Sequence, residues 1–365
     1  MPWRLIEDDG VDAAAGLAAD ELLAQRLGAG TSPPTLRLYT YRPHSALAGR
    51  FQNVDNEINV AQCDAHGIEV NRRPTGGGAI LMGPDQLGIA LTMRGRGDGQ
   101  LAKPRTLMQR FSAGIVQGLG MLGITASFRG KNDVEVDGRK IAGLGVYRDP
   151  SGGLLYHASL LVDLDVALMA QVLRMPFVDL DDRELAMLAT RTTSVRAGLH
   201  RAVSVAEVRA RMAAGFKSAF AVQLEGGELY SDEKAGVAAL VDTKYGTRAW
   251  VHQDTTVEDT TGGARTRTAS GAIELRVAMA GPTLKAVHVR GDFFAADAAI
   301  IDLEARLRWH PGARDKITAT ITEWAQAHPA ESVATDALID TIEKAVRQAS
   351  GEPYGCFVTP EQSHA

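Results

Sequence analysis

Residues 132–163 alternate polar and apolar side chains around two turns rich in glycine. Val134 and Val136 are separated by charged residues, Asp137-Gly138 is a strong two-residue hairpin turn, and residues 151–153 read Ser-Gly-Gly. The pattern predicts three antiparallel strands in a row. The middle of the chain is therefore expected to be a sheet.

The rest of the chain mixes helical and strand patterns. Apolar residues at steps of three or four predict an opening helix over residues 11–27 and another over 106–124, and a short helix is expected to end at Gly67. Further strands are expected at residues 35–41, 68–72, 79–82 and 88–93. Residues 164–254 read as mostly helical, with a polar connection at 178–199. The sequence thus predicts an α+β fold.

A change in composition divides the chain in two. Residues 254–270 are rich in Thr, Gly and charge, and we expect a linker at 255–268 between a domain at 1–254 and a smaller one at 269–350. The small domain is expected to hold a hairpin turning on Gly281-Pro282 and two or three helices. Residues 351–365 are expected to form a tail.

Charge and cysteine content limit the classes of function. A net charge of -5 gives no polycation for nucleic acid or an anionic membrane, so we expect neither partner. The two cysteines, Cys63 and Cys356, lie far apart and show no metal-ligand spacing. We find no secretory leader and no apolar run of membrane-spanning length, so a reducing, cytoplasmic setting is expected.

The segment "NRRPTGGGAILMG", residues 71–83, is the first candidate site. Gly76, Gly77 and Gly78 permit close approach of a ligand, and several N–H groups of such a loop can point at one anion. Neighbouring residues on a strand face opposite sides, so only one of Arg72 and Arg73 is expected at any pocket. By itself the segment is equally well a turn between two strands.

Other candidates lie in the strand region. Lys140 in "GRKIAG" is either a solvated strand residue or a point charge for a phosphate or an acyl phosphate. Asn132 and Asp133 begin the preceding strand, which also reads as an ordinary amphipathic one. His157 stands among apolar residues, where a core histidine is the simpler interpretation. Gly143 and its neighbour Gly145 form a weak glycine pair.

The joint order of these motifs is more specific than any one of them. "RRPTGGGA", then "KNDVEVDGRKIAG", "YHASLLVD" and "TSVRAGL", with "GRFQN" at 49–53, resemble the lipoate-protein ligases, which belong with the biotin protein ligases. The segment from residue 271 resembles the accessory domain of many lipoate ligases. The resemblance implies a mixed or antiparallel sheet flanked by helices, followed by a small α+β C-terminal domain.

The resemblance also implies a reaction. Lipoate and ATP, with Mg²⁺, would give lipoyl-adenylate and pyrophosphate, and the acyl group would pass to a lysine on a lipoyl domain of a 2-oxoacid dehydrogenase complex or on a glycine-cleavage H-type protein. Lys140 would be the catalytic cation, and Asp133 would flank the phosphate or its Mg²⁺. The other residues implied to bind substrate or ATP are Arg73, Thr75, Gly76, Gly77, Gly78, Ala79, Gln86, Asn132, Gly143 and His157. No tightly bound cofactor is implied.

Departures from the family pattern leave alternatives open. Met82-Gly83 stands where the family often has His-Asp, and Leu144-Gly145 replaces residues that often carry a hydroxyl. An octanoyltransferase of the same superfamily is one alternative, but its thioester chemistry needs a cysteine near Lys140, and residues 128–160 contain none. A non-catalytic module that binds lipoate or a lipoyl domain is the other.

Overall fold

The computed structural model describes residues 2–94, 103–174, 190–253 and 261–349. The chain divides into two compact units, Met1–Gln253 and Asp254–Ala365. The expected tail at 351–365, residues 255–260 of the expected linker and most of the polar connection at 178–199 lie outside the described residues. No helix in the described ranges has the length and apolar character needed to cross a membrane.

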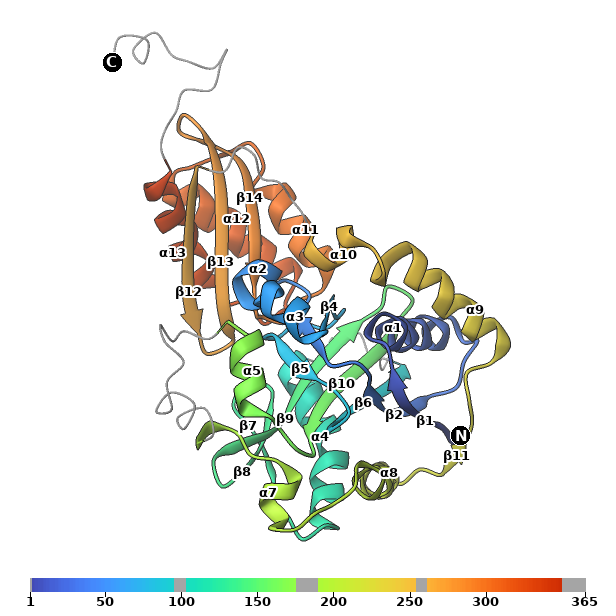
Figure 1. The fold of residues 1–365 in the computed structure, drawn as a ribbon. Coiled ribbons are helices and arrows are strands. Elements are labelled where there is room, and N and C mark those ends of the chain that lie inside the picture. Colours follow the sequence, from blue (N-terminus) through green and yellow to red (C-terminus); the bar gives the residue numbers. More distant parts are fainter. Residues whose placement is uncertain (1, 95–102, 175–189, 254–260, 350–365) are drawn as a thin grey trace. The chain divides into compact units, whose positions relative to one another are not determined.

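An eight-stranded mixed sheet forms the centre of the first unit (Figure 1). Its strand order is β11-β1-β2-β6-β10-β9-β8-β7, with β1 parallel to β2 and β11 and the other neighbours antiparallel. The strands are β1 (Trp3–Val11), β2 (Thr35–Tyr41), β6 (Gln86–Arg94), β7 (Ser127–Arg129), β8 (Asp133–Val136), β9 (Arg139–Arg148), β10 (Gly153–Leu161) and β11 (Leu224–Gly226). The expected run of three antiparallel strands is confirmed as β8, β9 and β10. Asp137 and Gly138 form their first turn with positive φ angles of 49° and 74°.

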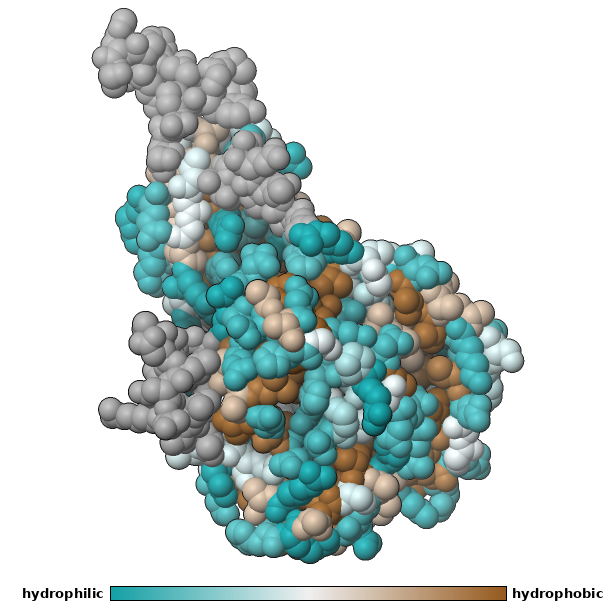
Figure 2. All heavy atoms as spheres, in the orientation of Figure 1, coloured by the Kyte–Doolittle hydropathy of each residue, from teal (hydrophilic) through white to brown (hydrophobic). Residues whose placement is uncertain are grey.

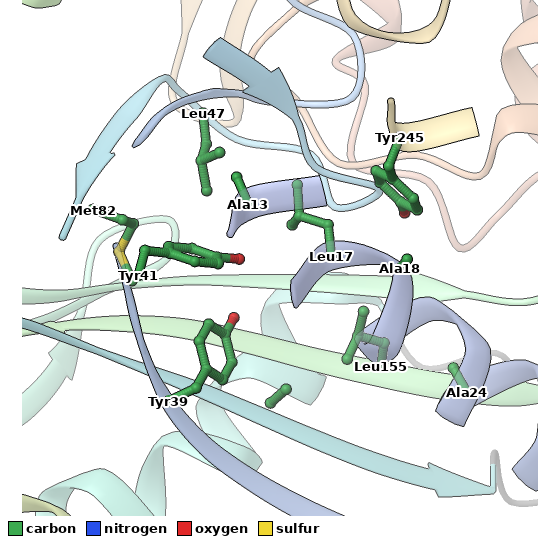
Figure 3. Close-up of a cluster of buried hydrophobic side chains, with 11 residues drawn as sticks. Ala13, Leu17, Ala18, Ala24, Tyr39, Tyr41, Leu47, Met82, Leu155 and Tyr245 are labelled. Atoms are coloured by element: carbon green, nitrogen blue, oxygen red, sulfur yellow. The ribbon is translucent and has the colours of Figure 1, made fainter. Parts of the chain in front are cut away.

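Helices cover both faces of this sheet, which explains why every residue of β10 is buried. On one face, Leu155 of β10 packs in a core cluster with α1 (Ala13–Ala29) and with Tyr245 of the π-helix η1 (Val241–Tyr245). In Figure 3, Leu17 and Ala18 of α1 lie between Tyr245 and Leu155. On the other face, Tyr156 meets Phe111 of α4 (Pro104–Gly120), and α8 (Val205–Phe220) packs on α4. The fold class expected from the sequence, α+β with a mixed sheet flanked by helices, is confirmed.

A small three-stranded sheet carries the glycine motif. Its order is β4-β3-β5, made of β3 (Ser45–Ala48), β4 (Glu69–Arg72) and β5 (Ile80–Met82). The short helices α2 (Val54–Glu57), α3 (Val60–His66) and α5 (Val166–Val172) accompany it, and residues of β3, β5, α3 and α5 share an apolar cluster. The remaining helices of the unit are α7 (Val195–Leu199), α9 (Ser231–Leu240) and α10 (Arg248–His252).

Four described strands of the first unit were not expected from the sequence: β1, β3, β7 and β11. We assigned no element to the first ten residues, yet β1 spans Trp3–Val11, because its neighbours β2 and β11 supply hydrogen bonds that a local pattern cannot reveal. β11 lies in the region expected to be mostly helical. The opening helix begins at Ala13 and not at residue 11, because Asp12 caps it by accepting from the Ala15 N–H.

In residues 261–349, the described part of the second unit, a four-stranded sheet is accompanied by three helices. Its strands, in sheet order, are β12 (Gly262–Thr268), β13 (Gly271–Ala280), β14 (Thr283–Gly291) and β15 (His310–Pro311). Its helices are α11 (Asp297–Arg306), α12 (Arg314–Ala327) and α13 (Thr335–Gln348). Residues 262–268, expected in the linker, instead form β12 against β13. Their threonines have β-branched side chains, which favour a strand. We predicted a linker because we gave more weight to the glycines and charged residues of this segment.

Candidate active site

Lys140 lies near the start of β9, directly after the hairpin turn. A β-bulge at this point aligns Val134 with Ala142 but Glu135 with Lys140, so Ile141 is the extra residue of β9. The Lys140 ammonium lies 2.8 Å from the Asp133 carboxylate, and both side chains are about one-third exposed (35% and 29%). The Lys140 carbonyl accepts from the Thr193 N–H (2.8 Å). Lys140 is thus held by neighbours on two sides and is not a freely solvated strand residue.

A cavity of about 480 Å³ opens beside Lys140. Apolar residues of β5, β10 and α5 supply much of its wall, whereas the charged lining residues come from β8, from β9 and from Arg191. The lining residues are Ala79, Ile80, Leu81, Asp133, Glu135, Gly138, Lys140, Gly143, Ser159, Leu161, Leu164, Met169, Leu173, Thr190, Arg191 and Thr192. On the face drawn in Figure 2, apolar atoms gather where Figure 1 draws α5 and β5. The cavity therefore combines an apolar wall with a charged region, as a fatty acyl chain with a polar head requires.

The absence of a side chain at Gly143 leaves space for the Lys140 amine. A Cβ at Gly143 would lie 3.0 Å from the Lys140 Nζ and 3.1 Å from its Cε. Gly143 pairs with Ser159 of β10, and both line the cavity. Four of the predicted site residues, Ala79, Asp133, Lys140 and Gly143, line this one cavity, and their roles stay predictions.

The two arginines of the glycine motif bind backbone, and neither lines the cavity. The Arg73 guanidinium donates to the carbonyl oxygens of Leu47 (3.0 Å), Gly76 (3.1 Å) and Gly78 (2.6 Å). Burial lowers the pKa of Arg73 to about 10. Arg72 donates to five carbonyl oxygens, including that of Gly49. Both arginines hold the loops around the glycines in place, so their role is structural.

The glycine segment lies over the glycines of β9. Thr75 accepts a hydrogen bond from Arg73 (3.2 Å), and a Cβ at Gly145 would lie 3.0 Å from the Thr75 Oγ1. Gly77 has a φ of 95°, and its carbonyl oxygen would lie 1.9 Å from a Cβ at Gly49. A Cβ at Gly78 would meet nothing within 4 Å. The segment is therefore a closely packed turn whose last part, Gly78 and Ala79, leads to the cavity.

His157 belongs to a buried polar network on the same face of β10 as Ser159. The Tyr39 hydroxyl donates to the Asp20 Oδ2 (3.0 Å) and lies 2.5 Å from the His157 Nε2. Burial would raise the pKa of Asp20, but Arg37 and His157 outweigh it, and the pKa is lowered. His157 does not line the cavity. The structure thus favours the interpretation of a histidine bound within the core.

Two further residues predicted to bind substrate or ATP have side chains that donate hydrogen bonds to backbone carbonyls. The Gln86 side chain donates to the Asp163 carbonyl (2.8 Å), and the Asn132 side chain donates to the Leu144 carbonyl (2.8 Å). Neither lines the cavity. Met82, one of the departures from the family pattern, is buried in the core cluster with Tyr39 and Tyr41 and also lies outside the cavity lining (Figure 3).

Sequence reasoning missed five polar residues of the described cavity lining: Glu135, Ser159, Thr190, Arg191 and Thr192. The alternation of "DVEV" places Glu135 on the same strand face as Asp133, and this signal was available. Arg191 carried no local signal. It lies near Lys140 because the residue that follows it, Thr192, forms a backbone bridge with Lys140 in the folded chain.

We tested whether the cavity suits a metal ion. In the described ranges, no group of three or more His, Cys, Asp or Glu side chains is arranged to hold one. Mg²⁺ bound through substrate phosphates needs only one or two carboxylates, which Asp133 and Glu135 could supply. The Asp133 carboxylate is already paired with Lys140. The residues therefore fit a Mg²⁺ delivered with phosphates, and not an independent metal site.

Comparison with known proteins agrees with this arrangement. Residues 12–217 match the family model of the lipoyl protein ligase A/B catalytic domain. The octanoyltransferase LipM of Symbiobacterium thermophilum is 30% identical over 273 residues, covering 68% of this chain and 97% of the relative. LipM of Bacillus subtilis is 27% identical over 271 residues, with 68% and 97% coverage.

Solved structures extend the comparison to the fold. A bipartite lipoate protein ligase from Thermoplasma acidophilum, described with its E2 lipoyl domain, superposes with a TM-score of 0.61 at 25% identity, covering 69% of this chain and 96% of that one. Lipoate-bound LipL1 of P. falciparum is 14% identical and shows the same fold over 94% of this chain and 99% of its own, with a TM-score of 0.72. This chain belongs to the lipoyl protein ligase A/B family of the biotin and lipoate protein ligase superfamily.

Proposed function

We propose that this protein transfers an octanoyl group, or its lipoyl derivative, to a lysine amine of a lipoyl domain. The observation that carries the proposal is the Lys140 ammonium beside a cavity of about 480 Å³ whose wall is largely apolar. Burial of an alkyl chain is worth about 0.8 kcal/mol per methylene, so such a wall favours a medium-chain acyl group. Lys140 is suited to bind the oxygen that becomes negative when an amine attacks the acyl carbon.

The donor that we favour is an octanoyl thioester, because the curated relatives described above are named octanoyltransferases. The acceptor lysine, as the free amine, attacks the thioester carbon, and a C–N bond forms. The C–S bond then breaks, the thiolate leaves, and the proton of the amine passes to the thiolate or to solvent. Lys140 holds the oxyanion in between, and this route needs neither ATP nor Mg²⁺.

An ATP-dependent ligase is the second candidate. One observation in its favour is that the described cavity lining contains no cysteine. Another is the similarity to a structure of lipoate-protein ligase A bound with ATP, which is 25% identical and has a TM-score of 0.60. In that route the acyl carboxylate attacks the α-phosphate of ATP, pyrophosphate leaves, and the adenylate is the acyl donor. Lys140 would bind the phosphate and acyl oxygens, and Asp133 and Glu135 are the carboxylates that could meet Mg²⁺.

The acceptors that we propose are lipoyl domains of 2-oxoacid dehydrogenase complexes or a glycine-cleavage H-type protein. The similar ligase of Thermoplasma acidophilum forms a lipoylation system with an E2 lipoyl domain, which supports this class of partner. We place the reaction in the cytoplasm, where these complexes and a reducing milieu for cysteine are found.

Intact-mass spectrometry of an apo lipoyl domain tests the proposal. One sample receives octanoyl-acyl carrier protein, a second receives octanoate with ATP and Mg²⁺, and a third receives lipoate with ATP and Mg²⁺. Addition of one octanoyl mass in the first sample alone supports the transferase, and addition only in the ATP samples supports the ligase. Lys140→Ala should lose at least about a hundredfold in rate, as expected when an oxyanion donor is removed. No acylation in any sample would refute both candidates.

A further inference from the structure

Arg191 is a cationic residue of the cavity lining that the family resemblance did not include. It is exposed, lines the cavity, and makes no ion pair or hydrogen bond with any residue that the structure describes. Arginine side chains at protein surfaces commonly pair with a carboxylate or a carbonyl, and the guanidinium offers five N–H donors. Among the described residues, Arg191 therefore offers a permanent positive charge without a carboxylate partner to a ligand that enters the cavity.

The described cavity lining holds two cations, Lys140 and Arg191, and they differ in their partners. Lys140 is paired with Asp133 at 2.8 Å. Glu135, on the same strand as Asp133, adds a second negative charge to that part of the wall. An anionic group that enters the cavity is repelled by Glu135 and attracted by Arg191.

The backbone holds Arg191 in place beside Lys140. Thr192 forms a parallel bridge with Lys140, and the Thr193 N–H donates to the Lys140 carbonyl at 2.8 Å. Arg191 thus directly precedes Thr192 and Thr193, whose backbone is bound to that of Lys140 in β9. Its backbone position is fixed by the same strand, although its side chain is exposed.

We propose that Arg191 binds a phosphate of the acyl donor. The inference rests on the proposed function, because both donor classes carry a phosphate: the adenylate bonds it directly to the acyl group, and the phosphopantetheine arm of an acyl carrier holds it at the end of the arm opposite the thioester. A guanidinium binds two phosphate oxygens at once, which a lysine ammonium cannot do with the same geometry. Arg191 then positions the donor, while Lys140 acts on the acyl oxygen.

Calorimetric titration with two ligand pairs tests this inference without requiring turnover. The first pair is octanoyl-4′-phosphopantetheine and octanoyl-pantetheine, and the second is AMP and adenosine. In the wild-type protein the phosphate should tighten binding about tenfold in one of the pairs, equal to about 1.4 kcal/mol. The pair that shows the difference identifies the source of the phosphate.

Variants assign that difference to the guanidinium. Arg191→Ala should reduce the tenfold ratio to about one and leave the phosphate-free ligand unaffected, and Arg191→Lys should retain part of it. Arg211→Ala, an exposed arginine of α8 outside the cavity lining, should keep the full ratio. Thermal melts of the variants control for folding.

Two outcomes overturn the inference: a wild-type protein with no phosphate-dependent difference in either pair, or Arg191→Ala with the wild-type ratio. The acylation assay described above is run in parallel. If no donor acylates the lipoyl domain while the Arg191-dependent ratio is present, the proposed function fails and the phosphate site stands.

Discussion

Gly143→Ala changes the position of the Lys140 amine while leaving the charge of the site intact. The added Cβ would lie 3.0 Å from Nζ, and ordinary contact begins at 3.4 Å, so the amine must move by about 0.4 Å. The atom in the way is the end of a flexible side chain, so the movement costs little energy. Displacement by 1 Å costs on the order of a hundredfold in rate, so 0.4 Å should cost about five- to tenfold.

Stability should change in the opposite direction. Gly143 is not among the glycines with positive φ, and replacing such a glycine by alanine restricts the unfolded chain. We expect the free energy of unfolding to rise by up to about 1 kcal/mol, as measured by urea denaturation. Gly226→Ala in β11 is the matched control, because its Cβ meets nothing within 4 Å. This control should gain similar stability and keep its rate.

The assay is the initial rate of lipoyl-domain acylation with a saturating donor. A normal rate for Gly143→Ala would refute the argument that the position of the Lys140 amine limits the reaction. A rate that falls together with the free energy of unfolding would show instead that the substitution damages the sheet.

Three further outcomes follow from the packing and charges of the first unit. Arg73→Met leaves three carbonyl oxygens without their donor and should lower the free energy of unfolding by about 3 kcal/mol in urea denaturation. Gly49→Ala, with its Cβ 1.9 Å from the Gly77 oxygen, should destabilise by more than about 2 kcal/mol, whereas Gly78→Ala should change stability by less than about 0.5 kcal/mol. The pKa of Asp20 is lowered in the folded protein. The stabilisation by its carboxylate is therefore complete above the unfolded pKa of about 4 and is lost as the pH falls below it. Between pH 6 and pH 3, the Tm of the Asp20→Asn variant should fall less steeply than the Tm of the wild-type protein.

The parts of the fold that the sequence predicted are those specified by neighbouring residues. The turn at Asp137-Gly138 and the helix end at Gly67, which has a φ of 63°, depend on local backbone geometry. β1 and β11 depend on each other, although more than 200 residues separate them along the chain. Strand pairing over such a separation has no local signature, so these two strands were missed. β12 pairs with its sequence neighbour β13, and it was missed because the glycines and charges of residues 262–268 suggested a linker.

The candidate site divides in the same way. Lys140, Asp133 and Gly143 lie within one hairpin, and the family resemblance, rather than the local pattern, suggested that they share a site. The family resemblance assigned one arginine of the glycine motif, Arg73, to ligand binding. Arg73 instead binds carbonyl oxygens that the loop itself presents, and only the folded loop reveals that the charge is already used.

The position of Cys63 bears on which acyl donor the protein uses. A covalent thioester intermediate needs an accessible thiolate, yet Cys63 is fully buried in the apolar cluster of α3, and burial together with Asp64 raises the pKa of its thiol to about 11. The other cysteine, Cys356, lies outside the described residues.

If neither thiol carries the acyl group, donor and acceptor must occupy the site together. Initial rates with octanoyl-acyl carrier protein should then give intersecting and not parallel lines when both substrates are varied. The double variant Cys63→Ala and Cys356→Ser should keep its rate within about twofold. A stable octanoyl-protein adduct that disappears in this variant, with loss of transfer, would contradict direct transfer and establish a covalent route.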